Sequence, residues 1–268
     1  DGMWIEDPGF PLIRPVIEQE NVALLPVPVD GDGLNVATGI RNYPDARFAL
    51  LTPAHQSPLG VALSLSRRHQ LLEWASHSQA WIIEDDYDSE FRYLGKPLPP
   101  LKSLDAPQRV IYAGTFSKSL FPALRTAWLV VPLPLVAAFR RQAQRLACPV
   151  PVLCQQTLAD FLREGHFWRH LKKMRVHYAQ RRRWLETALR ANGFQVLEQL
   201  GGIQLVVTVE GDDCAMARRA RQAGLAVQAV NDWRIRPRGN AGLIMSFTNI
   251  VSQQMADAQV TALKTAIK

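Results

Sequence analysis

The sequence predicts an α/β protein with a large part built on a mostly parallel sheet and a small α+β part after it. Three observations support this. Up to about residue 147, short continuous apolar runs alternate with helical patterns, which is typical of parallel strands covered on both faces. Residues 151–192 have a helical pattern throughout, and short strands with Gly-rich turns follow. We therefore expect a large domain over 1–164, an interdomain helix over 165–192 and a small domain over 193–268.

The elements expected in the large domain follow from these apolar runs. The strands expected, in chain order, are 3–5, 49–51, 80–83, 110–113 and 127–131. Between the second and third strands, Ser66 can cap a helix that runs through Leu71, Leu72 and Ala75. Alternation of strand and helix in this order is the pattern of a parallel sheet.

A long helix is expected over 166–191, after a break near Gly165 and with an end at Asn192-Gly193. Its apolar residues recur at helical spacing, namely Phe167, Leu171, Met174, Tyr178 and Leu185. The basic residues between them are expected to face outward, namely Arg169, Lys172, Lys173, Arg175, Arg181, Arg182 and Arg183. This basic face is either a solvated surface or a contact to nucleic-acid phosphates, and the sequence leaves both interpretations open.

The small domain is expected to combine short strands with two helices. The expected strands are 194–197, 203–209 and 243–247, and the expected helices are 214–223 and 253–267. Gly201-Gly202 separates the first two strands, and Gly224 ends the first helix.

Composition limits the class of protein. The chain has 268 residues, 47% of them hydrophobic and 21% charged, which is ordinary for a soluble globular protein. It has no run of 18 apolar residues and no signal peptide, so we expect a cytoplasmic protein without a membrane span. The three cysteines, Cys148, Cys154 and Cys214, have no disulfide or zinc spacing. A start at Asp1 with a strand pattern almost at once suggests a piece of a longer protein.

Five carboxylates lie within residues 84–90, EDDYDSE, directly after an apolar strand. Ligands bind at such strand ends in open α/β sheets. The run could hold a divalent metal, pair one carboxylate with a cationic ligand, or be a solvated loop. No phosphate-binding GxxxxGK[ST] and no GxSxG accompany it, and His166, His170 and His177 share no spacing with a carboxylate. No metal-binding residue is therefore expected.

Lys118 follows a second apolar strand, in YAGTFSKSL (112–120), so we expect its side chain to be partly desolvated and to need a partner. It comes 33 residues after Asp85, at the end of a neighbouring strand. A lysine that forms a Schiff base and an aspartate on a pyridinium nitrogen are what pyridoxal phosphate chemistry requires.

At this point the sequence resembles the aminotransferase-like domain of the MocR group of GntR-type transcription regulators, which is similar to fold type I pyridoxal-phosphate aminotransferases. The matching stretches are IEDPGFPLIRP (5–15), LLPVPVDGDGL (24–34), LLTPAHQSPLG (50–60), SLSRRHQLLEWA (64–75), IIEDDYDSEFRY (82–93), VIYAGTFSKSLFPALR (110–125) and MRVHYAQRRRWL (174–185). They cover most of residues 3–192.

The resemblance implies a role for each matching residue. Lys118 would form the Schiff base with pyridoxal 5'-phosphate, Asp85 would pair with the pyridine nitrogen, and Tyr87 would hydrogen-bond the phenolic oxygen. Three residues would hold the phosphate, namely Thr115, Ser117 and Arg125. Three more lie in a turn near the ring, namely His55, Gln56 and Ser57.

The sequence departs from the pattern of this family in three places. The winged-helix domain and the glycine-rich phosphate turn that the family implies would lie before Asp1, which puts cofactor occupancy in question. Ile244 stands where aminotransferases carry the arginine that binds the substrate carboxylate, although Arg234, Arg236 and Arg238 lie just upstream. Trp128 stands where a Gly-Tyr sequence is common.

Three functions remain open at this point. The resemblance favours an effector-sensing and dimerisation domain, in which a small amino compound reaches the cofactor and DNA is bound only through the winged-helix domain. Transamination would then be vestigial or regulatory. The alternatives are a genuine aminotransferase acting on an amino acid and a cofactor-free dimerisation module.

Overall fold

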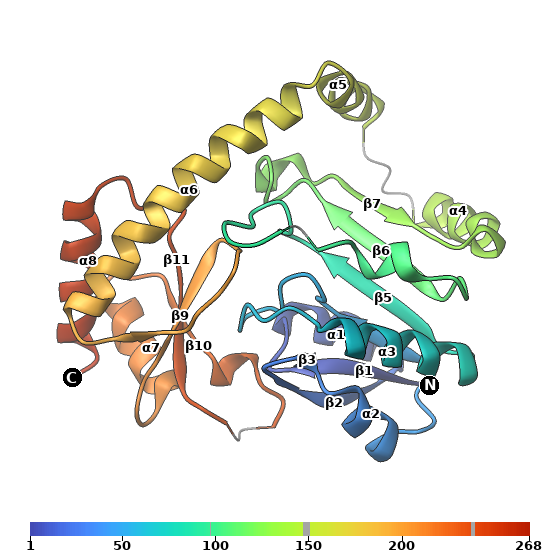
Figure 1. Ribbon diagram of the computed structural model, residues 1–268, viewed down its shortest axis with the longest axis horizontal. Helices are drawn as coiled ribbons and strands as arrows, with labels where there is room; N and C mark the ends of the chain where they lie inside the picture. The colour runs from blue at the N-terminus through green and yellow to red at the C-terminus, as the bar shows by residue number, and fades with distance from the viewer. Residues whose placement is uncertain (97, 147–150, 237–238) are drawn as a thin grey trace.

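The structure is a computed structural model, and it describes residues 1–96, 98–146, 151–236 and 239–268. A seven-stranded sheet forms the large part of the molecule (Figure 1). Its strands are β1 (Gly2–Asp7), β2 (Ala23–Asp30), β3 (Gly33–Leu34), β4 (Phe48–Leu51), β5 (Trp81–Asp86), β6 (Val110–Thr115) and β7 (Ala127–Val130). They lie in the order β3-β2-β1-β4-β5-β6-β7. The pairs from β2 to β6 are parallel and the two outer pairs are antiparallel, so the expected mostly parallel sheet is confirmed.

Strand β2 was not expected from the sequence, because Pro26 and Pro28 interrupt its apolar run. Residues two apart in a strand direct their N–H groups to the same edge, so these prolines remove donors from one edge only. Residues Ala23–Pro28 of β2 still pair in parallel with β1.

Helices and short 3-10 helices surround this sheet. They are η1 (Pro11–Ile13), α1 (Arg14–Gln19), α2 (Val36–Asn42), α3 (Leu65–His77), η2 (Leu101–Leu104), η3 (Pro122–Leu124), η4 (Leu133–Leu135) and α4 (Val136–Arg145). On one face, α2 and α3 bury a core in which the Trp4 and Trp74 rings stack with centroids 3.8 Å apart. The N-cap of α3 is Ser64, whose hydroxyl accepts from the Arg67 N–H. The expected cap at Ser66 is wrong, because that residue already lies in the first turn.

Strand β7 departs from the expected sheet covered on both faces. It runs antiparallel to β6, and Leu129 and Val130 are exposed. Trp128 now has a physical explanation, because it lies opposite Gly114 on β6 and packs against Phe116, with ring centroids 4.6 Å apart. A Cβ atom on Gly114 would come within 2.3 Å of the indole, so the large ring occupies the space that the glycine leaves.

Two helices lead to the small part of the molecule, α5 (Val152–Arg163) and the 26-residue α6 (His166–Ala191). Figure 1 shows α6 running diagonally from the side of the large sheet to the small part. Gly165 breaks the two helices with a positive φ of 74°, as expected. The expected apolar stripe is confirmed, but Arg182 is buried rather than facing outward. Its guanidinium donates to Glu186 at 2.7 Å and to the carbonyl oxygen of Gln199 at 2.7 Å.

A four-stranded antiparallel sheet forms the small part, in the order β10-β11-β9-β8. Its elements are β8 (Gln195–Val196), β9 (Gln204–Thr208), α7 (Asp213–Gln222), β10 (Val227–Ala229), η5 (Asn231–Trp233), β11 (Gly242–Ser246) and α8 (Gln253–Ala266). The short strand β10 was not expected. One face of this sheet packs with α6, α7 and α8 around a core that includes Leu205, Leu243 and Phe247.

Among the described residues, no helix combines the length and the apolar character needed to cross a membrane. Cys154 and Cys214 are free thiols, and Cys148 lies outside the described residues. The expected fold class is confirmed, whereas the exact domain limits 1–164, 165–192 and 193–268 stay a prediction.

Candidate functional site

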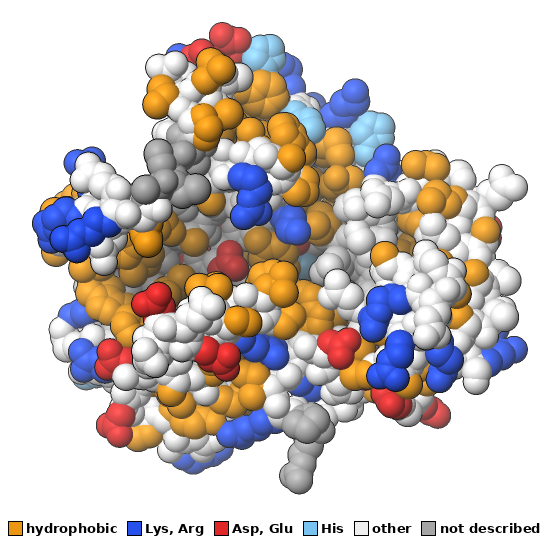
Figure 2. All heavy atoms as spheres, turned by 180° about the vertical axis from the view of Figure 1, so that it is seen from behind, with side chains coloured by type: hydrophobic (Ala, Val, Ile, Leu, Met, Phe, Trp, Pro, Cys, Tyr) orange, Lys and Arg blue, Asp and Glu red, His pale blue; other side chains and the backbone are white. Residues whose placement is uncertain are grey.

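A cavity of about 440 Å³ lies between the carboxyl ends of the large-sheet strands and the small sheet. The face of the molecule seen in Figure 2 is hollowed near its centre, with apolar side chains around the hollow. Five residues predicted from the sequence line the cavity, namely Ser57, Asp85, Tyr87, Thr115 and Lys118. A volume of this size is in the range of small-molecule sites.

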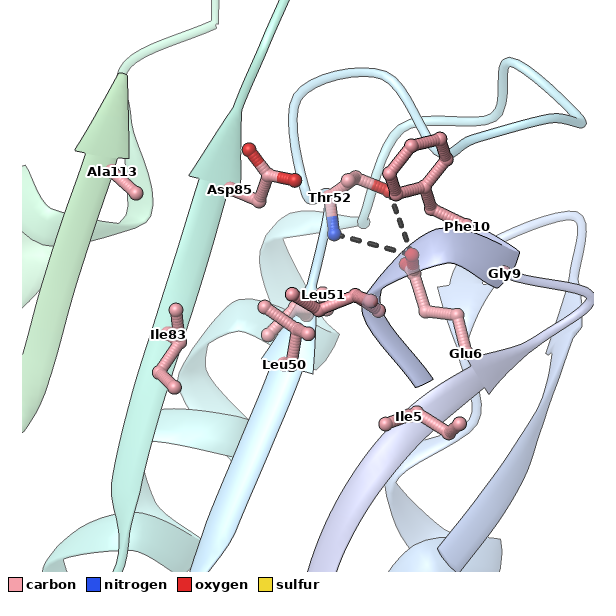
Figure 3. A pocket seen from close by; sticks show the side chains of 11 residues that line it. Ile5, Glu6, Gly9, Phe10, Leu50, Leu51, Thr52, Ile83, Asp85 and Ala113 are labelled. Atoms are coloured by element: carbon pink, nitrogen blue, oxygen red, sulfur yellow. Dashed lines mark hydrogen bonds between the residues drawn. The ribbon is translucent and has the colours of Figure 1, made fainter. Parts of the chain in front are cut away.

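Asp85 is the member of the acidic run that faces the cavity, and Figure 3 shows it at the end of β5 beside Thr52 and Phe10. Burial, together with the nearby charges of Asp86 and Asp88, raises the pKa of Asp85 to about 6. A cationic partner would stabilise the ionised form of this buried carboxyl group. Of the three interpretations of the acidic run, the geometry favours a carboxylate that pairs with a cationic ligand.

Two other carboxylates of the run, Glu84 and Asp86, accept hydrogen bonds elsewhere, so the run does not form one cluster. Glu84 is buried and accepts from the backbone N–H groups of Leu101 and Lys102, each at 2.7 Å. Asp86 accepts from the hydroxyls of Ser89 and Tyr112, each at 2.8 Å. Neither Glu84 nor Asp86 lines the cavity.

A second cavity of about 280 Å³ shares Phe10, Thr52 and Asp85 with the first. Glu6 lines it and accepts from the Thr52 hydroxyl at 2.7 Å and from the Thr52 N–H at 3.2 Å (Figure 3). Burial raises the pKa of Glu6 to about 7 in spite of these bonds. This second carboxyl group beside Asp85 was not expected from the sequence.

Tyr87 points into the cavity, and its phenol is held by the His55 residue. The Tyr87 hydroxyl donates to the His55 carbonyl oxygen at 3.2 Å and lies 3.1 Å from His55 Nδ1. The same Nδ1 atom is 3.2 Å from a carboxylate oxygen of Asp88, which is buried. Burial and the Asp88 charge raise the pKa of Tyr87 well above its ordinary value, so the phenol stays protonated at neutral pH.

The turn 55–57 separates into a cavity residue and two supporting residues. Ser57 lines the cavity, whereas His55 supports Tyr87 from behind. Gln56 is buried and does not line it. Its amide donates to the carbonyl oxygens of Pro8 and Ser57 and accepts from the Leu59 N–H. The position of Gln56 therefore indicates a role in the shape of the turn.

The end of β6 and the segment after it hold the remaining predicted residues. Thr115 and Lys118 line the cavity, but Ser117 and Arg125 do not, and Arg125 is exposed with a left-handed backbone at φ 48°. The Ser117 N–H donates to the Thr115 hydroxyl at 3.1 Å. Lys118 is exposed rather than partly desolvated, so the expected desolvation of this lysine is wrong in the present state of the site.

Sequence reasoning missed the residues that line the cavity from the other side. They come from the small sheet, from η5 and from the segment before η1, namely Phe10, Ile203, Gln204, Gln228 and Trp233. One signal was present for the amides, because Gln204 and Gln228 are polar residues in otherwise apolar strands, IQLVVT and AVQAV.

Among the described residues, one group of three could bring metal ligands together, namely Asp212, Asp213 and Cys214. It lies at the start of α7, away from the cavity-lining residues. The Asp213 carboxylate accepts from Asn231 and from the Gly242 N–H, which gives it a structural role.

Comparisons with known proteins identify the family of the chain. The profile of the family "Aminotransferase class I and II" matches residues 1–264. The HTH-type transcriptional regulator YdeL of Bacillus subtilis is 41% identical over 177 residues, which cover 66% of this chain and 38% of YdeL. The probable rhizopine catabolism regulatory protein MocR of Rhizobium meliloti is 34% identical over 271 residues, covering 99% of this chain and 54% of MocR.

A solved structure shows the same fold over the whole chain. The kynurenine aminotransferase of Pyrococcus horikoshii, solved in complex with PMP, matches with a TM-score of 0.90 at 25% identity and covers 100% of this chain and 69% of that one. The chain thus spans between about two fifths and a little over half of the two regulators. It belongs to the class I and II aminotransferase family, as an aminotransferase-like domain homologous to those of the MocR-type regulators of the GntR superfamily.

Proposed function

We propose that this domain attaches pyridoxal 5'-phosphate through Lys118 and senses a small amino compound, as the effector domain of a MocR-type transcription regulator. The observation that supports this most directly is the meeting of Asp85, Tyr87, Thr115 and Lys118 in one cavity. These side chains come from two neighbouring parallel strands and the segments that follow them. The homology to YdeL and MocR supports the regulatory part.

The residues of the cavity fit the cofactor chemically. A buried carboxyl group with a raised pKa, Asp85, is suited to a protonated ring nitrogen, because a cation beside it offsets the desolvation of the charged form. Tyr87, kept protonated by its surroundings, is suited to donate to a phenolic oxygen. When bound, the cofactor supplies an electrophilic carbon for amines and a ring that withdraws electrons.

The remaining proposed roles concern the lysine and the phosphate. Lys118 is exposed at the cavity, where its amine is accessible to an aldehyde. Thr115 ends β6, Ser117 follows it by two residues, and Arg125 follows the 3-10 helix η3. The Arg125 side chain has no hydrogen-bond or ion-pair partner in the described part of the chain, so its guanidinium can turn toward a phosphate. His55 and Gln56 would then support the turn around the ring.

A ligand could regulate the protein because the cavity lies between the large and the small sheet. A ligand that contacts both parts can favour one relative position over another, provided that its affinity differs between the two states. In the whole protein we propose that a homodimer in the cytoplasm transmits this change to DNA through a winged-helix domain. Contacts of the basic face of α6 with DNA would be limited to phosphates.

The test uses the full-length protein in wild-type form and as Lys118→Ala, with Lys172→Ala on the exposed side of α6 as the matched control. Pyridoxal phosphate is added, bound cofactor is followed by absorbance, and borohydride reduction followed by peptide mass analysis identifies the modified residue. We expect modification of Lys118 in the wild type and in the control only. A cofactor-free module would show no modification in any of the three proteins.

The regulatory part is tested by measuring operator affinity with and without cofactor and candidate amines. Identical affinity under all conditions would overturn it.

A genuine aminotransferase is the second candidate, and the high structural similarity to the kynurenine aminotransferase favours it. Sustained formation of a 2-oxo acid from an amino donor, over many turnovers per Lys118, would select that function.

A further inference from the structure

The small sheet presents one face to the cavity, and the strand registers determine which residues lie on it. Directly paired residues of antiparallel strands point to the same side. Gln228 of β10 pairs with Ile244 of β11, and Ile244 pairs with Val206 of β9. Gln204 lies two residues before Val206 and so belongs to the same face. Gln204 and Gln228 line the cavity from the small sheet, whereas Asp85 and Lys118 line it from the large part of the molecule.

Ile244, at the centre of this face, does not reach the cavity. Its side chain is 2% exposed and packs in a small apolar cluster with Val206, Val230 and Trp233. Trp233 of η5 lines the cavity. The indole therefore stands between the cavity and the position at which the resemblance led us to expect an arginine.

The nearby arginines do not replace that residue. Arg14 donates to the carbonyl oxygens of Gly9, Trp233 and Arg234. Arg234 lines a different cavity, beside Leu197 and Glu198, and Arg236 donates to the Tyr43 hydroxyl at 2.6 Å. Arg238 lies outside the described residues.

Among the described residues that line the cavity, Lys118 is therefore the only one with a cationic side chain. If Lys118 is attached to the cofactor, a free carboxylate in this cavity has no cation to pair with and has Asp85 nearby. Burial of an unpaired carboxylate is strongly unfavourable. An amino acid with a free α-carboxylate is thus a poor ligand for this site.

The two glutamines provide a different kind of contact. The Trp233 Nε1–H donates to Gln228 Oε1 at 2.8 Å, which fixes the orientation of the amide and leaves its NH₂ group as the donor toward the cavity. Gln204 makes no side-chain hydrogen bond to another described residue, so its amide is also available to a ligand. Phe10, Leu12 and Ile203 add apolar wall.

We infer that Gln204 and Gln228 bind the far end of the amino compound, and that this compound is an amine whose other end is neutral and accepts hydrogen bonds, such as a hydroxyl, carbonyl or carboxamide. The inference rests on the proposed function, because it takes Lys118 and the cofactor as the place where the amine reacts. It specifies the ligand class that the site selects.

The experiment compares probe pairs that carry a carboxamide or a carboxylate, with each dissociation constant referred to the unprotonated amine, because a carboxamide also lowers the pKa of the neighbouring amine. Phenylalaninamide is compared with phenylalanine, and alaninamide with alanine, by titration into the cofactor-loaded full-length protein at one pH. Dissociation constants are obtained from the change in cofactor absorbance and, independently, by calorimetry. We expect the amides to bind at least about tenfold more tightly than the acids, since the acid adds a buried unpaired charge.

Two variants and a control connect the preference to the residues. Gln228→Leu and Gln204→Leu should each weaken binding of the amino-acid amides about fivefold, which corresponds to the loss of one hydrogen bond. Neither variant should change binding of the free amino acids much. Gln195→Leu, an exposed glutamine on β8 of the same sheet, should leave both unchanged. Because Gln228→Leu also removes the partner of Trp233, Gln204→Leu separates loss of a ligand contact from a disturbed indole.

The possible outcomes distinguish the inference from the proposed function. If no cofactor attaches to the wild-type protein, the proposed function fails, and this inference fails with it. If cofactor attaches but acids bind as tightly as amides, the inference alone is overturned. The inference is equally overturned if both glutamine variants retain the wild-type preference.

Discussion

The Nδ1 atom of His55 lies 3.1 Å from the phenolic oxygen of Tyr87, and the backbone carbonyl oxygen of His55 accepts from the same hydroxyl. One residue thus restrains this phenol from two sides. The His55 ring is itself confined, since a Cβ atom on Gly202 would come within 2.1 Å of it. Gly202 has a positive φ of 85°, so both its backbone and the nearby ring favour glycine.

From this contact we predict that His55→Ala weakens binding of pyridoxal phosphate about fivefold, which corresponds to one lost hydrogen bond that orients Tyr87. The measurement is a spectrophotometric titration of the cofactor into the full-length protein. His69→Ala, an exposed histidine on α3, is the matched control and should bind as the wild type does. Equal affinity for His55→Ala and wild type would show that the contact does not position the phenol for the cofactor.

The sequence could predict the half of the cavity that contains Asp85 and Lys118, because strand periodicity and motif spacing determine it. Asp85 is the next-to-last residue of β5, and Lys118 follows β6 by a few residues. Since β5 and β6 are adjacent and parallel, with Asp85 paired to Ala113, their carboxyl ends meet. Periodicity and motif spacing are enough to infer this much.

The other half could not be predicted, because it depends on how two sheets pack together. Gln204, Gln228 and Trp233 are far from Lys118 in the chain, and no period in the sequence places them near it. Arg182 illustrates the same limit. It lies in a run of three arginines and was expected in solvent, but its contact with the Gln199 carbonyl oxygen depends on the loop before β9.

The second prediction distinguishes two adjacent carboxylates. Asp85→Asn should weaken cofactor binding about tenfold or more, because a neutral amide replaces the charged partner of the ring nitrogen. Asp86→Asn should change cofactor affinity less than about twofold, because Asp86 bonds Ser89 and Tyr112 and does not line the cavity. Both affinities come from the same titration, and urea unfolding of each variant shows whether its fold is intact. Equal losses in the two variants would contradict the assignment of Asp85.

The third prediction concerns the contact between Gly114 and Trp128. Gly114→Ala should lower the free energy of unfolding by about 1–3 kcal/mol, because the new methyl group would overlap the indole. Trp128→Leu gives that methyl group room, so the double variant should lose less stability than the two single variants together. Urea unfolding of the four proteins forms a double-mutant cycle. Strict additivity would mean that the indole does not limit the size of residue 114.

The last prediction follows from the raised pKa of Glu6. In the folded protein this pKa is about 7, against an ordinary value of 4.5, because the carboxyl group is buried. The folded state therefore keeps a proton that the unfolded chain releases, so this group lowers the free energy of unfolding as the pH rises from about 4.5 to about 7. The whole effect is at most roughly 3 kcal/mol and is complete above pH 7.

In Glu6→Gln the side chain keeps an oxygen that can accept hydrogen bonds from Thr52, but it has no group that ionises. We expect the stability of this variant, relative to wild type, to increase by up to roughly 3 kcal/mol between pH 4 and pH 8. Asp85 and Glu90 also have raised pKa values, about 6 and about 7, but both remain in the variant, so the difference between the two curves isolates Glu6. Glu18→Gln on the exposed side of α1 is the control and should follow the wild-type curve. A Glu6→Gln curve parallel to wild type from pH 4 to pH 8 would show that Glu6 ionises in the folded protein as readily as in the unfolded chain.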